Sequence, residues 1–234
     1  MMRSISAILF FWALVSSAGI VVAENALPRV LILGDQIYQQ PASELRKELK
    51  GKVEVHYPML EPGEVWNSTT AMDLVDRQLG DDQWDLIHFN CGLGDLIYRV
   101  PGVKAFRVMP KHAGGVRATD SKQYERNLHM LVTRLKASGA KLIWATTTPI
   151  RHSATNVFTK GTEIEYNAIA AKVMAKHGIP TNDMYAFVKG LIDMNKPAGH
   201  GADPFFFDRK PIHPPILDIL RKYLGVVPVN LSKP

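Results

Sequence analysis

Short apolar runs alternate with segments of helical period along most of this chain, and this alternation constrains the fold more than any other feature. The runs expected to form strands are residues 29–34, 52–57, 84–90, 141–146 and 179–183. In the first run, RVLILG, all residues between Arg29 and Gly34 are apolar, as is typical of a central parallel strand, whereas KVEVHY alternates as an edge strand does. The pattern therefore predicts a three-layer α/β/α sandwich around a doubly wound, five-stranded parallel sheet.

The segments between these runs predict helices. They are expected over 41–49, about 67–79, 120–138, 162–177, about 185–194 and 216–224. Residues 162–165 (TEIE) have the spacing of a capping box, so this helix is expected to bury Ile164, Ile169 and Val173. The stretch from 91 to 115 is expected to be a long polar loop.

The first 23 residues have the pattern of a secretory signal peptide. A basic start at Arg3 precedes the apolar run AILFFWALV, and small residues end at Ala23. An uncleaved N-terminal membrane anchor is the less favoured interpretation, because the apolar run is short for a bilayer span. We therefore expect a secreted or periplasmic protein with a single domain over 24–234.

Composition excludes several classes of protein. The net charge of +6 comes from 28 Lys and Arg against 22 Asp and Glu, and we expect it to be spread along the chain. No nucleic-acid partner, and no membrane contact beyond the signal segment, is therefore expected. The one cysteine, Cys91, excludes an intramolecular disulfide and is expected to be buried. The eight histidines form no metal motif, so neither a metal nor another cofactor is expected.

Polar residues follow the predicted strands where ligands bind in such sheets, at the carboxyl ends of the strands. Asp35 and Gln36 follow the first strand, and Asn90 ends the third, with Gly92 and Asp95 just beyond it. These residues are the first candidates for a binding site.

Three blocks of sequence together resemble the SGNH/GDSL hydrolases. They are VLILGDQ, ending at Gln36, HFNCGLGD at 88–95 and PIHPP at 211–215, in the order and at about the spacing of that family. The resemblance spans nearly the whole chain after residue 23. It implies a flavodoxin-like α/β/α fold and hydrolysis of acyl or acetyl esters of carbohydrates or lipids.

The resemblance also implies roles for individual residues. Asn90 matches the oxyanion asparagine, and His213 matches the general base. Gln36 stands where the family has its nucleophilic serine, and an amide nitrogen is not nucleophilic, so covalent catalysis at this position is expected to be lost. Lys210 stands at the position of the orienting aspartate, which leaves Asp208 as a possible orienter.

Other residues are candidates for contact with a ligand. Asp35, Gly92, Asp95 and Arg151 are predicted to bind substrate, with Arg151 suited to an anionic group. The run 205–207 (FFF) is expected to line an apolar subsite or to be buried in the core.

The sequence thus predicts a secreted SGNH/GDSL hydrolase-like protein with impaired catalysis, whose ligand is a small-molecule or carbohydrate ester. The alternatives are a non-catalytic ester- or carbohydrate-binding pseudoenzyme and a structural interaction module. The sequence does not indicate the oligomeric state.

Overall fold

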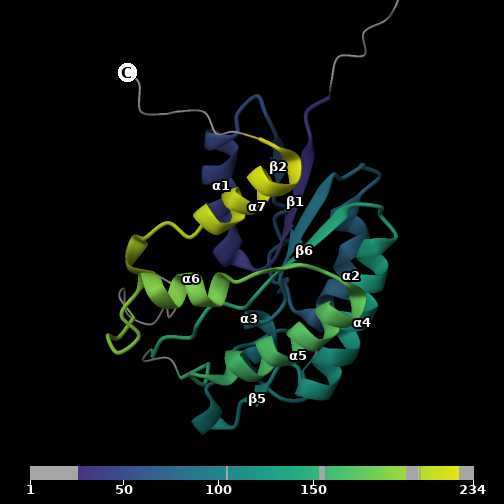
Figure 1. Ribbon diagram of the computed structural model, residues 1–234. Helices are drawn as coiled ribbons and strands as arrows, with labels where there is room; N and C mark the ends of the chain where they lie inside the picture. Colours follow the sequence, from purple (N-terminus) through teal and green to yellow (C-terminus); the bar gives the residue numbers. More distant parts are fainter. Residues whose placement is uncertain (1–25, 104, 153–155, 199–204, 206, 227–234) are drawn as a thin grey trace, which may run out of the picture.

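Five parallel strands form the central sheet of the computed structural model, in the order β2-β1-β3-β6-β7 (Figure 1). The strands are β1 (Arg29–Leu33), β2 (Glu54–His56), β3 (Leu86–Phe89), β6 (Lys141–Ala145) and β7 (Thr181–Asn182). β2 lies at one edge, as its alternating pattern predicts. This is the flavodoxin-like strand order, with its switch point between β1 and β3, so the predicted α/β/α fold is confirmed.

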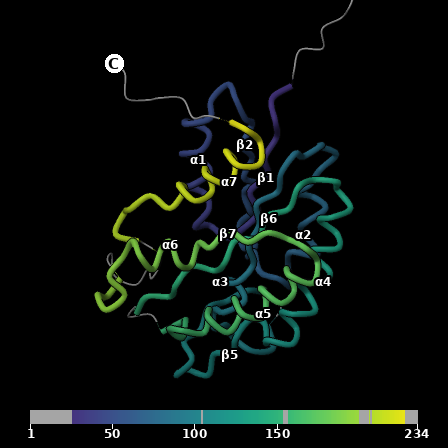
Figure 2. Tube along the Cα trace, in the orientation of Figure 1, coloured from purple at the N-terminus to yellow at the C-terminus, as the bar shows by residue number. Residues whose placement is uncertain are grey.

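Helices cover both faces of the sheet. One face carries α2 (Ser68–Leu79), α4 (Ser121–Lys136) and α5 (Thr162–His177), and the other carries α1 (Gln39–Glu48), α6 (Met184–Leu191) and α7 (Pro214–Leu224). The Cα trace in Figure 2 shows the two groups on opposite sides of the strands. The three layers therefore bury apolar side chains on both faces of the sheet.

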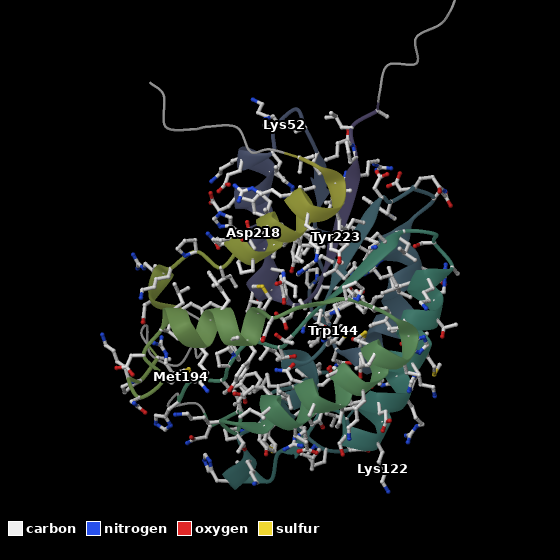
Figure 3. The ribbon with its side chains drawn as sticks, in the orientation of Figure 1. Lys52, Lys122, Trp144, Met194, Asp218 and Tyr223 are labelled. Atoms are coloured by element: carbon white, nitrogen blue, oxygen red, sulfur yellow. The ribbon has the colours of Figure 1, made fainter. Side chains whose placement is uncertain are left out.

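Side chains of successive strand residues enter the two cores alternately. On β1, Leu31 and Leu33 pack toward α2 and α4, whereas Val30 and Ile32 pack toward α1 and α7. Trp144 of β6 is fully buried, and Figure 3 shows it at the centre of the molecule. Burial of each such side chain contributes roughly 1.5–3 kcal/mol, so the continuous apolar runs of the sequence account for the sheet.

The helix α5 differs from its prediction. Thr162 is the first helical residue and Gly161 the cap, so the predicted capping box does not form. The buried face includes Glu163, Tyr166 and Val173, while Ile164 is 55% exposed, which corrects the expectation that it is buried. The reason is a polar contact: Glu163 Oε1 accepts a hydrogen bond from the Ile150 backbone N–H at 3.1 Å.

The stretch 91–115 is expected to be one long loop, and the structure shows instead that it contains short helices and a short strand. Short elements occupy it and the residues just beyond: α3 (Leu93–Leu96), β4 (Tyr98–Arg99), η2 (Lys111–Ala113) and β5 (Val116–Arg117). β4 and β5 pair antiparallel and form a second, two-stranded sheet. The strands are too short for periodicity to reveal them.

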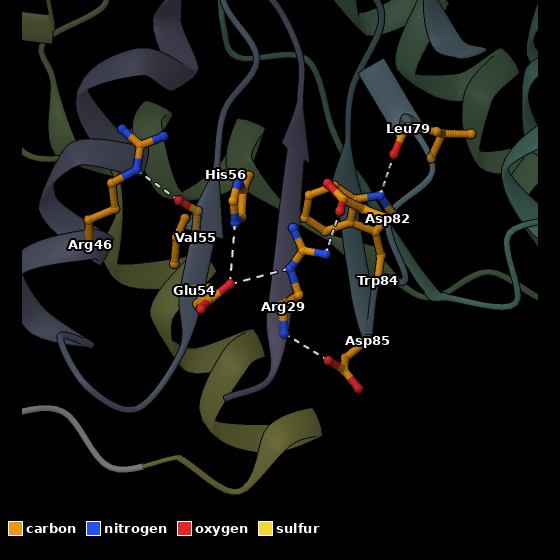
Figure 4. Close-up of polar contacts among 9 residues, drawn as sticks. All are labelled: Arg29, Arg46, Glu54, Val55, His56, Leu79, Asp82, Trp84 and Asp85. Carbon is orange, nitrogen blue, oxygen red and sulfur yellow. Dashed lines mark hydrogen bonds and ion pairs between the residues drawn. The ribbon is translucent and has the colours of Figure 1, made fainter. Parts of the chain in front are cut away.

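A charged network ties together the amino ends of the strands (Figure 4). The Arg29 guanidinium lies 2.8 Å from Asp82 and 3.3 Å from Glu54, and it stacks over the ring of Trp84. This guanidinium holds the pKa of Asp82 below its usual value. The network lies at the edge of the sheet opposite the carboxyl ends, so its role is structural.

The structure describes residues 26–103, 105–152, 156–198, 205 and 207–226. The predicted signal peptide, 1–23, lies outside these residues. Within them, every helix is too short or too polar to span a bilayer.

Candidate functional site

The turn after β1 places Gln36 at the carboxyl edge of the sheet. Asp35 caps the short helix η1 (Gln36–Tyr38), and its Oδ1 accepts a hydrogen bond from the Ile37 N–H at 3.3 Å. A side chain at Gly34 would overlap the ring of Tyr38, so the close packing of this turn requires glycine. Gln36 itself is exposed and faces a pocket.

The carboxyl group of Asp35 is turned toward the protein interior. Its Oδ2 is buried and has no hydrogen-bond partner among the described residues. Burial raises the pKa of Asp35 to about 7, because the charged form loses its hydration. Asp35 therefore borders the pocket, while one carboxyl oxygen is withdrawn from it, and its contact with a substrate remains a prediction.

Asn90 is buried just beyond the end of β3, where its side chain links neighbouring segments. Its Nδ2 donates to the Ala145 carbonyl at 2.8 Å and to Thr147 Oγ1 at 3.2 Å. These two contacts use both amide hydrogens. Asn90 does not line the pocket that Gln36 faces. The role of Asn90 as an oxyanion donor remains a prediction. In this structure both hydrogens of its amide are already donated to Ala145 and Thr147.

Aromatic donors hold the backbone beside Asn90. Trp66 Nε1 donates to the Asn90 carbonyl at 2.6 Å, and the Tyr124 hydroxyl donates to the Cys91 carbonyl at 2.7 Å. Cys91 is fully buried, as expected, and burial raises the pKa of its thiol. A side chain at Gly92 would overlap Thr147, so Gly92 serves close packing here.

Asp95 joins α3 to the start of α2. Its carboxylate accepts hydrogen bonds from Ser68, from the backbone N–H at 3.0 Å and from Oγ at 2.6 Å. Asp95 is fully buried, and burial raises its pKa to about 6. The structure gives Asp95 protein partners, and it does not place this residue among those lining the pocket.

Arg151 and Asp208 form a two-pronged ion pair. Arg151 Nη1 and Nη2 lie 3.1 and 3.0 Å from the two carboxyl oxygens of Asp208. The Arg151 side chain is completely buried, and its guanidinium holds the pKa of Asp208 below the usual value. Both residues were candidates for other roles, Arg151 for an anionic ligand and Asp208 for orienting His213. The structure instead brings them to each other.

His213 lies apart from Gln36. Its Nε2 is 2.7 Å from Oε1 of Glu48, the last residue of α1, whereas Gln36 precedes the first residue of that helix. Ten helical residues span about 15 Å, at about 1.5 Å per residue. The structure therefore binds the His213 ring to the end of α1 opposite Gln36, although Ile212, the residue before His213, lines the same pocket as Gln36.

A pocket of about 810 Å³ opens where Gln36 is exposed. Its wall is largely apolar: Leu60, Val65, Trp66, Leu93, Ile97, Phe106, Val108, Phe158, Phe205, Phe207 and Ile212. Polar groups at its rim include Gln36, Gln39, Gln40, Arg209 and Lys210. Its volume and mixed lining are typical of a site for a small organic ligand.

Phe205 and Phe207 line this pocket, and Phe207 is also buried in the core, so the two alternatives for this run, apolar subsite and core, both apply to Phe207. Phe206 lies outside the described residues. Residues 207–209 (η3, Phe207–Arg209) all have left-handed backbone, with φ between 46° and 58°. Such backbone is costly for residues other than glycine. The bond from Arg151 to Asp208 fixes the middle of this strained segment. In the described part of the chain, no three His, Cys, Asp or Glu side chains are grouped to hold a metal ion.

Comparison with known proteins extends this description. No protein-family model and no curated protein sequence matches the chain. Among solved structures, an acetyl xylan esterase superposes with a TM-score of 0.60 at 12% identity, over 82% of this chain and 99% of that one. A protein from Slackia heliotrinireducens assigned to the SGNH hydrolases gives 0.54 at 17% identity, over 86% of this chain and all of that one (100%).

A lipase/acylhydrolase from Enterococcus faecalis gives a TM-score of 0.56 at 12% identity, over 84% of this chain and 96% of that one. The chain has the SGNH hydrolase fold. At these identities the similarity establishes the architecture, so what the site does has to be argued from its own residues.

Several residues at the site of this SGNH-fold protein escaped the sequence prediction. Trp66 and Phe158 come from segments that carry no family-like block, although both are large aromatic residues in loops or at their ends. Glu48 lies at the end of a helix with a polar outer face, where a carboxylate is ordinary. Only Gln39 and Gln40 could have been noted, because they repeat the amide of Gln36 within one turn.

Proposed function

We propose that this protein binds small acyl esters in the pocket beside Gln36 and forms no covalent acyl-enzyme. One observation supports this most strongly: the pocket opens at Gln36, while His213 is held by Glu48 at the far end of α1. Acyl transfer through an enzyme intermediate needs a nucleophile and a base within hydrogen-bond reach. Among the described residues that line this pocket, position 36 offers a carboxamide and none is a histidine.

The lining of the pocket supports an ester as ligand. Phe106, Phe158 and Phe205 give an apolar wall that suits an acyl group. The amides of Gln36, Gln39 and Gln40 can donate to an ester carbonyl and accept from the hydroxyl groups of a sugar. Two proteins of the same fold are named an acetyl xylan esterase and a lipase/acylhydrolase, which supports the same class of ligand.

Two measurements test the proposal together. Rapid mixing with 4-nitrophenyl acetate is expected to give no burst of nitrophenolate. Acetylated xylobiose is expected to raise the thermal midpoint, since a ligand of the folded state stabilises it, whereas unacetylated xylobiose has a smaller effect. A burst that disappears in His213→Ala would overturn the proposal.

A pair of variants locates the binding. Gln40→Trp is expected to fill the rim of the pocket and to abolish the thermal shift, because Gln40 is exposed and borders the pocket. Lys50→Trp adds the same bulk beyond the end of α1, away from the pocket residues, and is expected to keep the shift. Loss of the shift in both variants, or in neither, would contradict binding at this pocket.

We also propose that the protein is exported, on the basis of the signal-like pattern of residues 1–23. Expression of the full chain with its own N-terminus, followed by N-terminal sequencing of the extracytoplasmic fraction, tests this. The expected first residue is Glu24. An uncleaved chain that stays with the membrane would support an anchor instead.

A further inference from the structure

The segment 96–119, which contains β4 and β5, concentrates the positive charge of the chain. It holds five cations and no carboxylate: Arg99, Lys104, Arg107, Lys111 and Arg117. The segment therefore has a net charge of +5, whereas the whole chain has a net charge of +6. The charge, expected from the sequence to be spread along the chain, is therefore largely local. We call this segment the hairpin surface.

The described cations of the hairpin surface have aromatic and hydroxyl neighbours, and no carboxylate among the described residues pairs with them. Arg99 lies over the ring of Phe106, Lys111 lies over that of Tyr98, and Arg117 donates to the Tyr166 hydroxyl at 3.5 Å. In the part of the chain that the structure describes, none of these three, nor Arg107, forms an ion pair with a carboxylate. Their uncompensated charge favours an anionic partner.

Apolar side chains are exposed among these cations. Val103, Val108 and Val116 are 37%, 48% and 46% exposed. Figure 1 shows β5 at the lower edge of the molecule, below α5, where the segment extends away from the central sheet. Exposed valines beside unpaired Arg and Lys are typical of a surface that meets the boundary between lipid headgroups and acyl chains.

We propose that the hairpin surface binds an anionic lipid bilayer. The described cations, Arg99, Arg107, Lys111 and Arg117, would lie against the headgroups, and Val103, Val108 and Val116 would enter the interface. Attraction of cations to anionic lipid falls off within the Debye length, so binding weakens as salt rises. A soluble polyanion would attract the same cations but would gain nothing from the exposed valines, and for that reason we favour lipid.

The position of this surface relative to the pocket strengthens the inference. Phe106 and Val108 belong to the hairpin surface and also line the pocket beside Gln36. A bilayer on the hairpin surface would therefore lie beside the pocket entrance, where amphiphilic esters are most concentrated. The lipid contact stands on its own observations, because Arg107 and Lys111 do not line the pocket.

Vesicle co-sedimentation tests the charge requirement. The protein is expected to bind phosphatidylcholine vesicles that contain phosphatidylglycerol, to ignore those without it, and to dissociate as salt rises. Arg107→Glu with Lys111→Glu is expected to weaken binding by at least about tenfold. Lys50→Glu with Lys172→Glu reverses two exposed charges, one just beyond α1 and one on α5, and is the matched control, expected to bind as wild type does.

A second pair of variants separates lipid from polyanion. Val103→Ser with Val116→Ser changes no charge and no pocket residue, and it is expected to weaken vesicle binding several-fold while retention on a heparin resin stays the same. Equal binding to neutral vesicles, or equal loss in the control pair, would overturn the proposal. Unchanged vesicle binding by the valine variant would overturn the lipid assignment and show that the surface takes polyanions generally.

Circular dichroism establishes that each variant is folded. The thermal shift with acetylated xylobiose is measured on the same proteins and is expected to persist in the Arg107→Glu, Lys111→Glu variant. Failure of the lipid contact and failure of ester binding therefore give different results.

Discussion

His213 Nε2 lies 2.7 Å from Glu48 Oε1, and this contact joins the start of α7 to the end of α1. Gln36 precedes the opposite end of α1. The chain thus has the fold of the SGNH hydrolases, and the histidine predicted to act as a base has a carboxylate partner on α1. Substitutions at Glu48 and at Gln36 test separately the stability that this contact provides and the absence of an acyl-enzyme.

Glu48→Ala is expected to destabilise the protein. It removes the partner of a histidine that is only 8% exposed, and a lost hydrogen bond between half-buried side chains costs about 1 kcal/mol. Urea denaturation measures the free energy of unfolding. Glu44→Ala, one turn earlier, is the control: its partner Lys47 is exposed, so its effect is expected to stay within about 0.5 kcal/mol. An equal decrease in the free energy of unfolding of the two variants would show that the contact between Glu48 and His213 does not stabilise the protein.

Gln36→Ser is expected not to create an acyl-enzyme. A serine hydroxyl at this position is expected to lack its histidine base, because the His213 ring is bound to Glu48 at the opposite end of α1. Rapid mixing with 4-nitrophenyl acetate, followed by intact-protein mass spectrometry, would detect a bound acetyl group. Acetylation that requires both Ser at position 36 and His213 would mean that the ring leaves Glu48 in solution.

Local patterns predicted the fold because each strand and helix is encoded in a short window of sequence. The run 29–34 became β1 with only its last residue outside the strand, and Asn67 caps α2 as its residue type suggests. The exposure of Ile164 was missed because burial of Glu163 depends on the Ile150 N–H, which belongs to a loop outside the helix.

The site was harder to predict because its contacts join distant parts of the chain. Glu48 and His213 are 165 residues apart, and Arg151 and Asp208 are 57 apart. Asn90 was placed at the strand end, yet no pattern near it indicates that Ala145 and Thr147 take both of its amide hydrogens. The positions of polar residues followed from strand ends, whereas their partners depended on the packing of the whole domain.

Asp35→Asn is expected to change how stability depends on pH. Burial raises the Asp35 pKa from 3.8 to about 7, so between these values the folded protein holds a proton that the unfolded chain does not. This contribution to stability is complete below about pH 4 and is lost as the pH rises to about 7. Asn does not titrate, so the Asp35→Asn variant does not lose stability in this way. As the pH rises from about 4 to about 7, its free energy of unfolding is therefore expected to increase relative to that of wild type.

Urea denaturation of wild type and Asp35→Asn at about pH 4 and about pH 8 gives the free energy of unfolding of each protein at both pH values. Asp73→Asn is the control, because it makes the same chemical change at an exposed position on α2. The same pH response in wild type and Asp35→Asn would show that the Asp35 carboxyl is hydrated in solution.

Gly94→Ala is expected to damage both stability and the pocket. Gly94 lines the pocket, and a Cβ at this position would overlap the Trp66 carbonyl and approach Asn67 Cβ to 3.1 Å. Forcing backbone apart in a packed region costs roughly 1–3 kcal/mol, and displacement of Trp66 would alter the pocket wall. Gly190→Ala is the control: the space around it in α6 is open, so alanine is expected to stabilise the helix by about 0.5–1 kcal/mol. Urea denaturation and the thermal shift with acetylated xylobiose distinguish the two. If Gly94→Ala kept full stability and ester binding, the approach of α3 to the segment before α2 would be looser than the structure shows.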